Sequence, residues 1–223
     1  MGEQNVKLND DDLTYQRFMK SLLIEVKALE TMLDRGLIES GVRRIGAEQE
    51  MFLIDKAHKP ALAAMDILKN MDDKRFTHEL GLFNLEANLS PQDLKGNCLR
   101  LMEAEVEEVY QRAREAASEV DCEIALVGIL PTLTKKNLGL DSMVPTPRYY
   151  ALNDAIRSLR GDDFHFTING IDQLSVKHDN VMLEACNTSF QVHFQVSPEN
   201  FARQYNFAQA VTGPLLAAAV NSP

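Results

Sequence analysis

Two glutamates lie two positions apart in the stretch Gly46-Ala47-Glu48-Gln49-Glu50-Met51-Phe52-Leu53-Ile54-Asp55. Side chains alternate between the two faces of a β-strand, so Glu48 and Glu50 are expected to point the same way. Two carboxylates at the end of an otherwise apolar strand are costly to bury unless positive charge lies beside them. A bound divalent cation would supply that charge, and an Arg or Lys pair is the plainer alternative.

A second group of polar side chains falls in segment 76–90, which also alternates like a strand. Asn84 and Glu86 share one face there. Glu79 precedes Gly81, where we expect a bulge or bend, so its direction does not follow from alternation. This segment therefore adds two carboxylates and one amide to the candidate site.

A third strand-like segment, 184–196, places Gln191 and His193 on one face. If the three segments are neighbours in one sheet, four carboxylates converge and repel one another strongly unless a metal is present. Carboxylate and amide oxygens are the ligands that hard cations prefer. Magnesium or manganese bridging the phosphates of a nucleotide would account for this cluster.

Each of these residues also has a plain structural interpretation. A Glu-x-Glu pair commonly lies on a solvated strand face, and a lone histidine such as His193 is commonly a hydrogen-bonded core residue. Glu79 beside His78 is compatible with a surface pair, and Arg148 with a surface residue at the start of a helix. Only the combination of these positions indicates a site.

The composition describes an ordinary globular protein and excludes several partners. The chain has 223 residues, a net charge of −10, 45% hydrophobic residues and 25% charged residues. The acidity argues against nucleic acid and anionic membranes as partners. Neither GxGxxG nor GxxxxGK[ST] occurs, so neither a Rossmann nor a P-loop nucleotide site is indicated.

The cysteines and the apolar segments favour a cytoplasmic protein. Cys98, Cys122 and Cys186 are odd in number and widely spaced, which is typical of reduced thiols. No signal peptide is visible, and the longest weakly polar stretch, 208–220, is too short to span a bilayer.

Hydrophobic periodicity predicts an α+β fold with a largely antiparallel sheet and flanking helices. Helices are expected at 13–35, 65–71, 98–119, 148–160 and 197–220, the last interrupted by Pro214. Strands are expected at 41–55, 60–64, 76–90, 122–130, 164–170 and 184–196. Segment 132–146 reads as a loop. Residues 1–40 are expected to form a leader and helix, with 1–13 peripheral, and the sheet is expected to begin at residue 41.

Several of these motifs, in this order, resemble the glutamate–cysteine ligase family and its carboxylate–amine ligase relatives. That family has the glutamine synthetase/guanido kinase fold, and the resemblance covers about residues 43–223. It implies that 41–223 is the N-terminal part of a glutamine synthetase-like catalytic domain, which is incomplete here. It rests on Gly46-Ala47-Glu48-Gln49-Glu50-Met51-Phe52, Glu79 with Gly81-Leu82-Phe83-Asn84-Leu85-Glu86-Ala87-Asn88-Leu89-Ser90-Pro91, Arg148-Tyr149, Thr188-Ser189-Phe190-Gln191-Val192-His193 and Ala219-Val220-Asn221-Ser222-Pro223.

The resemblance implies an ATP-dependent ligase that uses Mg²⁺ or Mn²⁺ and makes an amide through an acyl phosphate. The implied acid is the γ-carboxylate of glutamate and the implied amine is cysteine, as in glutathione biosynthesis. By resemblance, Arg148 holds a substrate carboxylate, Asn84 and His193 contact nucleotide or substrate, and no residue is assigned as catalytic. The implied metal ligands are Glu48, Glu50, Glu79, Glu86 and Gln191, the last standing where glutamine synthetases carry a ligand histidine.

Family members continue well beyond residue 223, so we expect either part of a longer ligase or a shortened protein. An incomplete sheet would expose an edge and apolar surface and favour a homo-oligomer. The alternatives are a related ligase with another acid or amine, a truncated non-catalytic module that binds metal or nucleotide, and a metal-dependent hydrolase.

Overall fold

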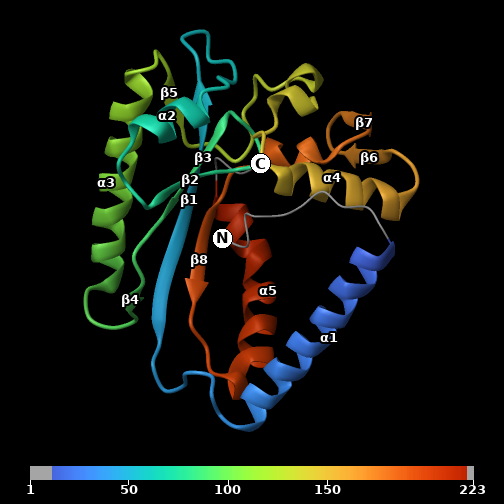
Figure 1. Cartoon of the computed structure of the whole chain (residues 1–223). Helices are drawn as coiled ribbons and strands as arrows, with labels where there is room; N and C mark the ends of the chain where they lie inside the picture. The colour runs from blue at the N-terminus through green and yellow to red at the C-terminus, as the bar shows by residue number, and fades with distance from the viewer. Residues whose placement is uncertain (1–11, 220–223) are drawn as a thin grey trace.

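One long strand, β1 (Arg44–Ile54), organises the sheet in the computed structural model of this chain, which describes residues 12–219 (Figure 1). Phe52 pairs with a residue of β3 and with one of β5, and Ile45 pairs with a residue of β4 and with one of β8. A residue that pairs with two strands has one on each side, so β1 has partners along both edges. One edge carries β3 (Asn84–Asn88) and β4 (Gln92–Asp93), and the other carries β8 (Phe190–Phe194) and β5 (Glu123–Ala125). All these pairs are antiparallel, and β2 (Phe76–His78) extends the sheet beyond β3.

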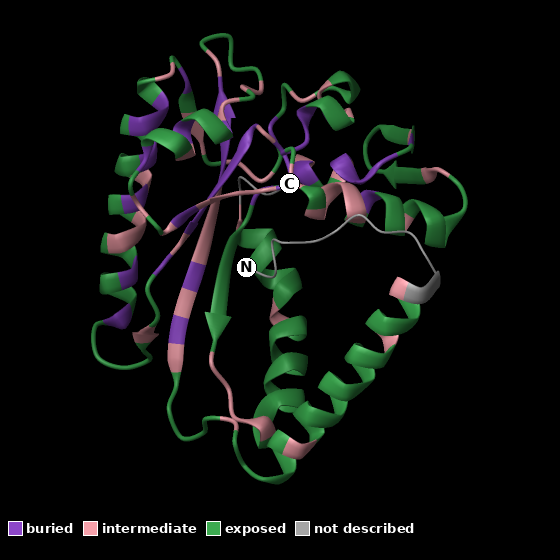
Figure 2. Cartoon of the chain, in the orientation of Figure 1, coloured by how far each residue is buried: buried purple, intermediate pink, exposed green. Residues whose placement is uncertain are grey.

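Alternation along β1 directs one set of side chains toward two helices. Met51 and Leu53 of β1 are fully buried against α2 (Ala64–Asn70) and α3 (Cys98–Ser118), as Figure 2 shows for the buried face of α3. The apolar residues of α3 recur at helical spacing, with Met102, Val109 and Ala113 all buried. This core holds one face of the sheet rigidly.

The opposite face of the sheet has a second core at the far end of β1. Phe52 and Phe83 are fully buried there, and their rings stack with centroids 6.2 Å apart. Met143 and Met182 pack on the same core, together with α4 (Pro147–Arg160). The segments that build it include two short 3₁₀ helices, η1 (Lys135–Leu138) and η3 (Val181–Cys186). A third, η2 (Leu140–Ser142), directly precedes Met143. Glu48 and Glu50 share this face with Phe52, so β1 passes from a polar half to an apolar half.

Several elements carry large apolar side chains in contact with solvent. Figure 2 shows α1 (Asp12–Asp34) and α5 (Phe201–Ala218) almost entirely exposed. Phe18, Phe194 and Phe207 are each exposed by more than half of their surface. None of the helices among residues 12–219 is long and apolar enough to cross a membrane.

The α+β class with an antiparallel sheet and flanking helices is confirmed, while several strand boundaries differ from those expected. In segment 122–130 only Glu123–Ala125 forms a strand, and in segment 184–196 only Phe190–Phe194 does, because residues 181–186 form η3. The two segments also meet in an isolated bridge between Ile129 and Asn187. A separate hairpin joins β6 (Phe164–Asn169) to β7 (Gln173–His178).

Shorter segments differ in the same way. Segment 60–64 contributes only the bridge between Ile54 and Pro60, and the expected loop 132–146 contains η1 and η2. Helix α5 is preceded by η4 (Pro198–Asn200) and continues through Pro214. Most of the expected leader, residues 1–11, lies outside the described residues.

Candidate metal and substrate site

Three carboxylates from separate segments meet on the polar half of the β1 face. Glu50, Glu79 and Glu86 each offer an oxygen within 4.8 Å of the others, and we call these residues the acidic trio. The β1–β3 register places Glu50 directly opposite Glu86. Like charges at directly opposed positions destabilise a sheet, so the trio is not explained by strand pairing.

The raised pKa values of the carboxylates in and beside the trio favour a proton or a cation close to them. Burial raises the pKa of Glu79 to about 8, helped by a hydrogen bond with Glu86 and by the charge of Glu86. Burial also raises the pKa of Glu48, and repulsion from Glu86 adds to the shift. A proton or a cation would therefore accompany Glu79 near neutral pH.

Neighbouring polar groups hold two members of the trio in place. Glu50 accepts hydrogen bonds from the backbone N–H of Ser189 (2.7 Å) and from Nε2 of Gln191 (2.8 Å). Oε1 of Glu86 accepts a hydrogen bond from Nδ2 of Asn88 (2.6 Å). Each carboxylate oxygen has two lone pairs, so these bonds orient the carboxylates and leave acceptor capacity for a cation.

Glu48 and Gln191 lie beside the trio rather than in it. Glu48 pairs with Asn88 on one edge of β1 and with Gln191 on the other. Its Oε1 atom is 3.7 Å from Nε2 of His193, which is an ion pair whenever His193 is protonated. Gln191 donates its amide nitrogen to Glu50, so in this rotamer its amide orients a carboxylate.

The donor set of the trio suits a hard divalent cation. All the groups that converge are carboxylate oxygens, the ligands that Mg²⁺ and Mn²⁺ take. The trio alone would give a bound cation three protein ligands. Glu48 lies two residues before Glu50, on the same face of β1. Mg²⁺ usually keeps several water or phosphate ligands, so a three-carboxylate site fits it without a complete protein cage.

A cavity of about 670 Å³ opens from Glu79 and Glu86 toward helix α4, and we call it the α4 cavity. This volume is in the range of small-molecule sites. Its lining combines polar and apolar side chains. It is lined by Thr77, His78, Glu79, Leu80, Glu86, Arg148, Tyr149, Leu152, Ile156, Phe164, Phe166, Asn180, Val181, Leu183, Glu184 and Asn187.

A second cavity, of about 650 Å³, opens from Glu50 toward the end of α5, and we call it the α5 cavity. Gln49, Val127, Thr188 and Ser189 line its β1 side, and Leu215 and Leu216 line its helix side. Glu50 therefore faces one cavity, while Glu79 and Glu86 face the other. The acidic trio stands between two cavities.

Arg148 lines the α4 cavity, and the structure does not place Asn84 there. Within residues 12–219, the partly buried Arg148 side chain has no ion-pair or hydrogen-bond partner, so its guanidinium is available for an anion. Asn84 is 1% exposed, and both atoms of its amide lack a partner among the described residues. It packs beneath Gly81, away from the space that a ligand could reach.

Two features of the α4 cavity were absent from the sequence-based site. Glu184 lines it, and part of this side chain is exposed to solvent. Partial desolvation of its carboxylate, followed by repulsion from Glu50, raises the pKa of Glu184. Oη of Tyr149 lies 3.3 Å from Nδ1 of His78, and burial raises the pKa of Tyr149 to about 12. Alternation predicts a strand that begins at Glu184, so the sequence does not indicate that this residue lies within η3. The clue for Tyr149 was its place next to Arg148.

A comparison with protein families bears on the site. A family model described as glutamate-cysteine ligase family 2 matches residues 44–223, which include β1 and every element that lines the two cavities. No curated protein and no solved structure matches the chain significantly.

Proposed function

This chain belongs to glutamate-cysteine ligase family 2, and on that premise we propose that it joins the γ-carboxylate of glutamate to the amine of cysteine with cleavage of ATP. Membership already makes it a ligase of the glutamate–cysteine ligase type. The substrates and the course of the reaction are the proposal. Its partners would be amino acids and ATP, and the reaction would take place in the cytoplasm.

One observation carries this proposal: the acidic trio lies between two cavities of similar size. A ligase must bring the γ-phosphate of ATP and the acid substrate together from different directions, because the attacking and leaving oxygens lie in line at phosphorus. A carboxylate cluster reached from two sides suits that requirement. A single cavity on one side would suit simple metal binding equally well.

In the proposed reaction, a carboxylate oxygen of the acid attacks the γ-phosphorus and ADP leaves. The amine nitrogen then attacks the acyl carbon of the acyl phosphate, phosphate leaves with the C–O bond electrons, and the nitrogen loses a proton. Mg²⁺ or Mn²⁺ held by Glu50, Glu79 and Glu86 would neutralise phosphate charge. Arg148 would bind a substrate carboxylate by paired N–H donors. Ser189 and Gln191 would keep Glu50 oriented.

The test is ATP cleavage that requires both substrates, measured on the full protein as ADP release with and without glutamate and cysteine. We expect release only with Mg²⁺ and with both amino acids present. Glu50→Gln should lower kcat by about a hundredfold or more, because the variant loses a charged oxygen aimed at the metal. Glu103→Gln, at an exposed position on α3, is the matched control and should keep full activity. ADP release that ignores the amine would overturn the proposal.

A further inference from the structure

Helix α1 lies outside the part of the chain that the family accounts for. It spans Asp12–Asp34, and the family match begins at residue 44. In Figure 1 it diverges from α5 toward its N-terminal end. Among residues 12–219, no side chain of α1 belongs to either hydrophobic core. The ligase chemistry therefore leaves α1 without a role.

Apolar side chains nevertheless follow one side of α1 along most of its length. Six of them recur at spacings that alternate between four and three residues, the repeat by which a helix presents a seam to a partner helix. We call this set the α1 seam, and it consists of Tyr15, Met19, Leu22, Val26, Leu29 and Leu33. Tyr15, Val26 and Leu29 are exposed by 65%, 57% and 51%. Covering the seam would remove this apolar surface from water and is therefore favourable.

The spacing and the charges of α1 indicate which kind of partner covers the seam. The repeat of four and three is that of paired helices, and it does not match the two-residue period of a strand. The polar positions of α1 are mixed in charge, because Arg17, Lys20 and Lys27 are interspersed with Glu25, Glu30 and Asp34. A helix that lies on an anionic membrane surface carries mainly Lys and Arg on its polar face. We therefore expect another helix against the seam.

The α1 seam is complementary to itself when a second copy of α1 runs in the opposite direction. A twofold axis at residue 24 places every seam residue opposite another seam residue. The three pairs, each with one residue from either copy, are Leu22 with Val26, Met19 with Leu29 and Tyr15 with Leu33. A self-complementary contact of this kind closes as a dimer.

The charges beside the seam favour this direction over a parallel one. Glu25 lies along one flank of the seam and Glu30 along the other. In a parallel pair unlike flanks meet, so Glu25 of each copy would face Glu30 of the other, twice in the dimer. In an antiparallel pair like flanks meet, so Glu30 faces Gln16 and only Glu25 meets a like charge, once at the axis. Facing like charges destabilise paired elements, so the antiparallel pair is the more stable.

We propose that α1 is a dimerisation helix, which pairs antiparallel with α1 of a second copy of this chain through the α1 seam. This inference goes beyond the proposed ligase function and does not depend on it. One helix offers less surface than the roughly 800 Å² that each partner buries in a stable protein interface. We therefore expect a reversible dimer that dissociates on dilution.

Sedimentation equilibrium of the full protein, over a wide range of concentrations, tests the role of the seam. Leu22→Glu should raise the dissociation constant of the dimer about a hundredfold or more, because it buries a carboxylate from each copy. Ile24→Glu is the matched control, since Ile24 lies on the opposite side of α1 and is 61% exposed. It should leave the dissociation constant unchanged. Circular dichroism should show the same helix content in both variants.

Cross-linking tests the direction of the pair. Leu22→Cys and Val26→Cys are mixed and oxidised with diamide, with the wild type as the background from the native cysteines. An antiparallel pair should give a disulfide between the two variants, because these positions face each other. Disulfides within each variant alone would show a parallel pair and overturn the antiparallel register.

Other outcomes would overturn the dimer itself. A monomer at every concentration would do so, and so would a dimer that Leu22→Glu and Ile24→Glu weaken equally. A monomer in which Leu22→Glu lowers the free energy of unfolding more than Ile24→Glu would assign the seam to another part of the same chain. None of these results bears on ATP cleavage, whose dependence on glutamate and cysteine is measured separately.

Discussion

Among the residues of the site, Glu79 has the carboxyl whose pKa is raised to about 8. Its carboxyl comes from the segment after β2 and meets Glu86 of β3 and Glu50 of β1, so three separate pieces of chain bring like charges together. Its raised pKa, about 8, means that the folded protein without a cation holds a proton there near neutral pH. A bound cation would take the place of that proton.

This proton makes stability depend on pH. The folded-state pKa of Glu79, about 8, lies above its ordinary value of 4.5, so between these pH values the folded protein binds more protons than the unfolded chain. The free energy of unfolding should therefore fall as pH rises from about 4.5 to about 8. Glu48 and Glu184, whose pKa values are also raised, act in the same direction.

In Glu79→Gln, the decrease in the free energy of unfolding between pH 4.5 and 8 should be smaller by about 1–2 kcal/mol. This figure is discounted because the Glu79 side chain is partly open to solvent. Urea denaturation in EDTA at several pH values between 5 and 8 would measure it. Glu103→Gln should keep the wild-type slope. A wild-type stability that is flat over this range would show that the trio is ionised without cost and needs no cation.

At the residue scale, alternation was enough to predict that Glu48 and Glu50 share a face, and that Asn84 and Glu86 do. It did not separate Glu86, which reaches the trio, from Asn84, which is buried beneath Gly81. Both lie on the same face of β3, and the difference is set by the segments that cover each end of that face. Those segments are distant in sequence, so a pattern within one strand holds no information about them.

At the element scale, the turn between β2 and β3 decides where Glu79 points. Gly81 lies in this turn and forms a bridge with Met143. A Cβ atom at Gly81 would lie 2.5 Å from Oδ1 of Asn84, 3.1 Å from Cε2 of Phe83 and 3.2 Å from Cβ of Ala185. Because Asn84 and Phe83 are fully buried, neither side chain has room to move aside.

Gly81→Ala should therefore destabilise the protein by about 1–3 kcal/mol, the range for overpacking a tight core. Chemical denaturation would measure it, with Gly46→Ala in β1 as the control. A Cβ at Gly46 meets nothing closer than 3.9 Å, so that variant should stay within about 0.5 kcal/mol of the wild type. Equal stability of both variants would contradict the close packing of the β2–β3 turn.

The helices could be predicted closely, and the strands only in part. The apolar spacing of 98–119 identified α3 to within one residue of its end, because a long amphipathic helix has a strong period. The strand expected at 184–196 begins too early, because residues 184–186 belong to η3, where Ala185 packs in the second core. The β7 strand Gln173–His178 was not predicted, because its alternation rests on two apolar residues alone, Leu174 and Val176.

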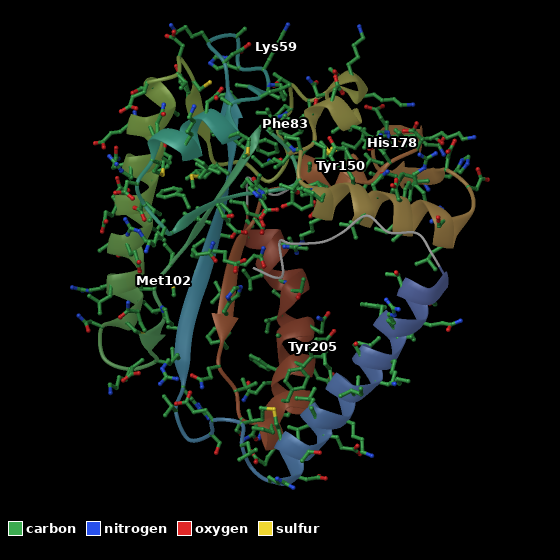
Figure 3. The ribbon with its side chains drawn as sticks, in the orientation of Figure 1. Lys59, Phe83, Met102, Tyr150, His178 and Tyr205 are labelled. Carbon is green, nitrogen blue, oxygen red and sulfur yellow. The ribbon has the colours of Figure 1, made fainter. Side chains whose placement is uncertain are left out.

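At the scale of the whole molecule, the two faces of one sheet have separate roles. One face packs on α2 and α3 and fixes the strand register. Figure 3 shows Met102 on α3 at this side, while Tyr150 of α4 and His178 of β7 lie across the molecule, beyond Phe83. The other face holds the trio and both cavities. The sequence could indicate acidic strands in one sheet, but the two cavities arise only from the packing of α4, η3 and α5.

The homo-oligomer expected from exposed apolar surface remains a prediction. Large apolar residues on α1, α5 and β8 are exposed among the described residues, with Phe18 at 60% and Phe194 at 58%. Light scattering across a range of protein concentrations would measure the association. A monomer at every concentration would show that these surfaces do not pair copies of the chain.

The central claim is that the acidic trio serves acyl transfer through an acyl phosphate. The most direct measurement supplies glutamate labelled with ¹⁸O in its γ-carboxylate, together with Mg²⁺, ATP and the amine, and analyses the released phosphate by mass spectrometry. We expect one ¹⁸O atom in the phosphate for each amide formed, since the carboxylate oxygen that attacks phosphorus leaves with it. Amide formation with unlabelled phosphate, or labelled water as the only source of ¹⁸O in phosphate, would contradict it.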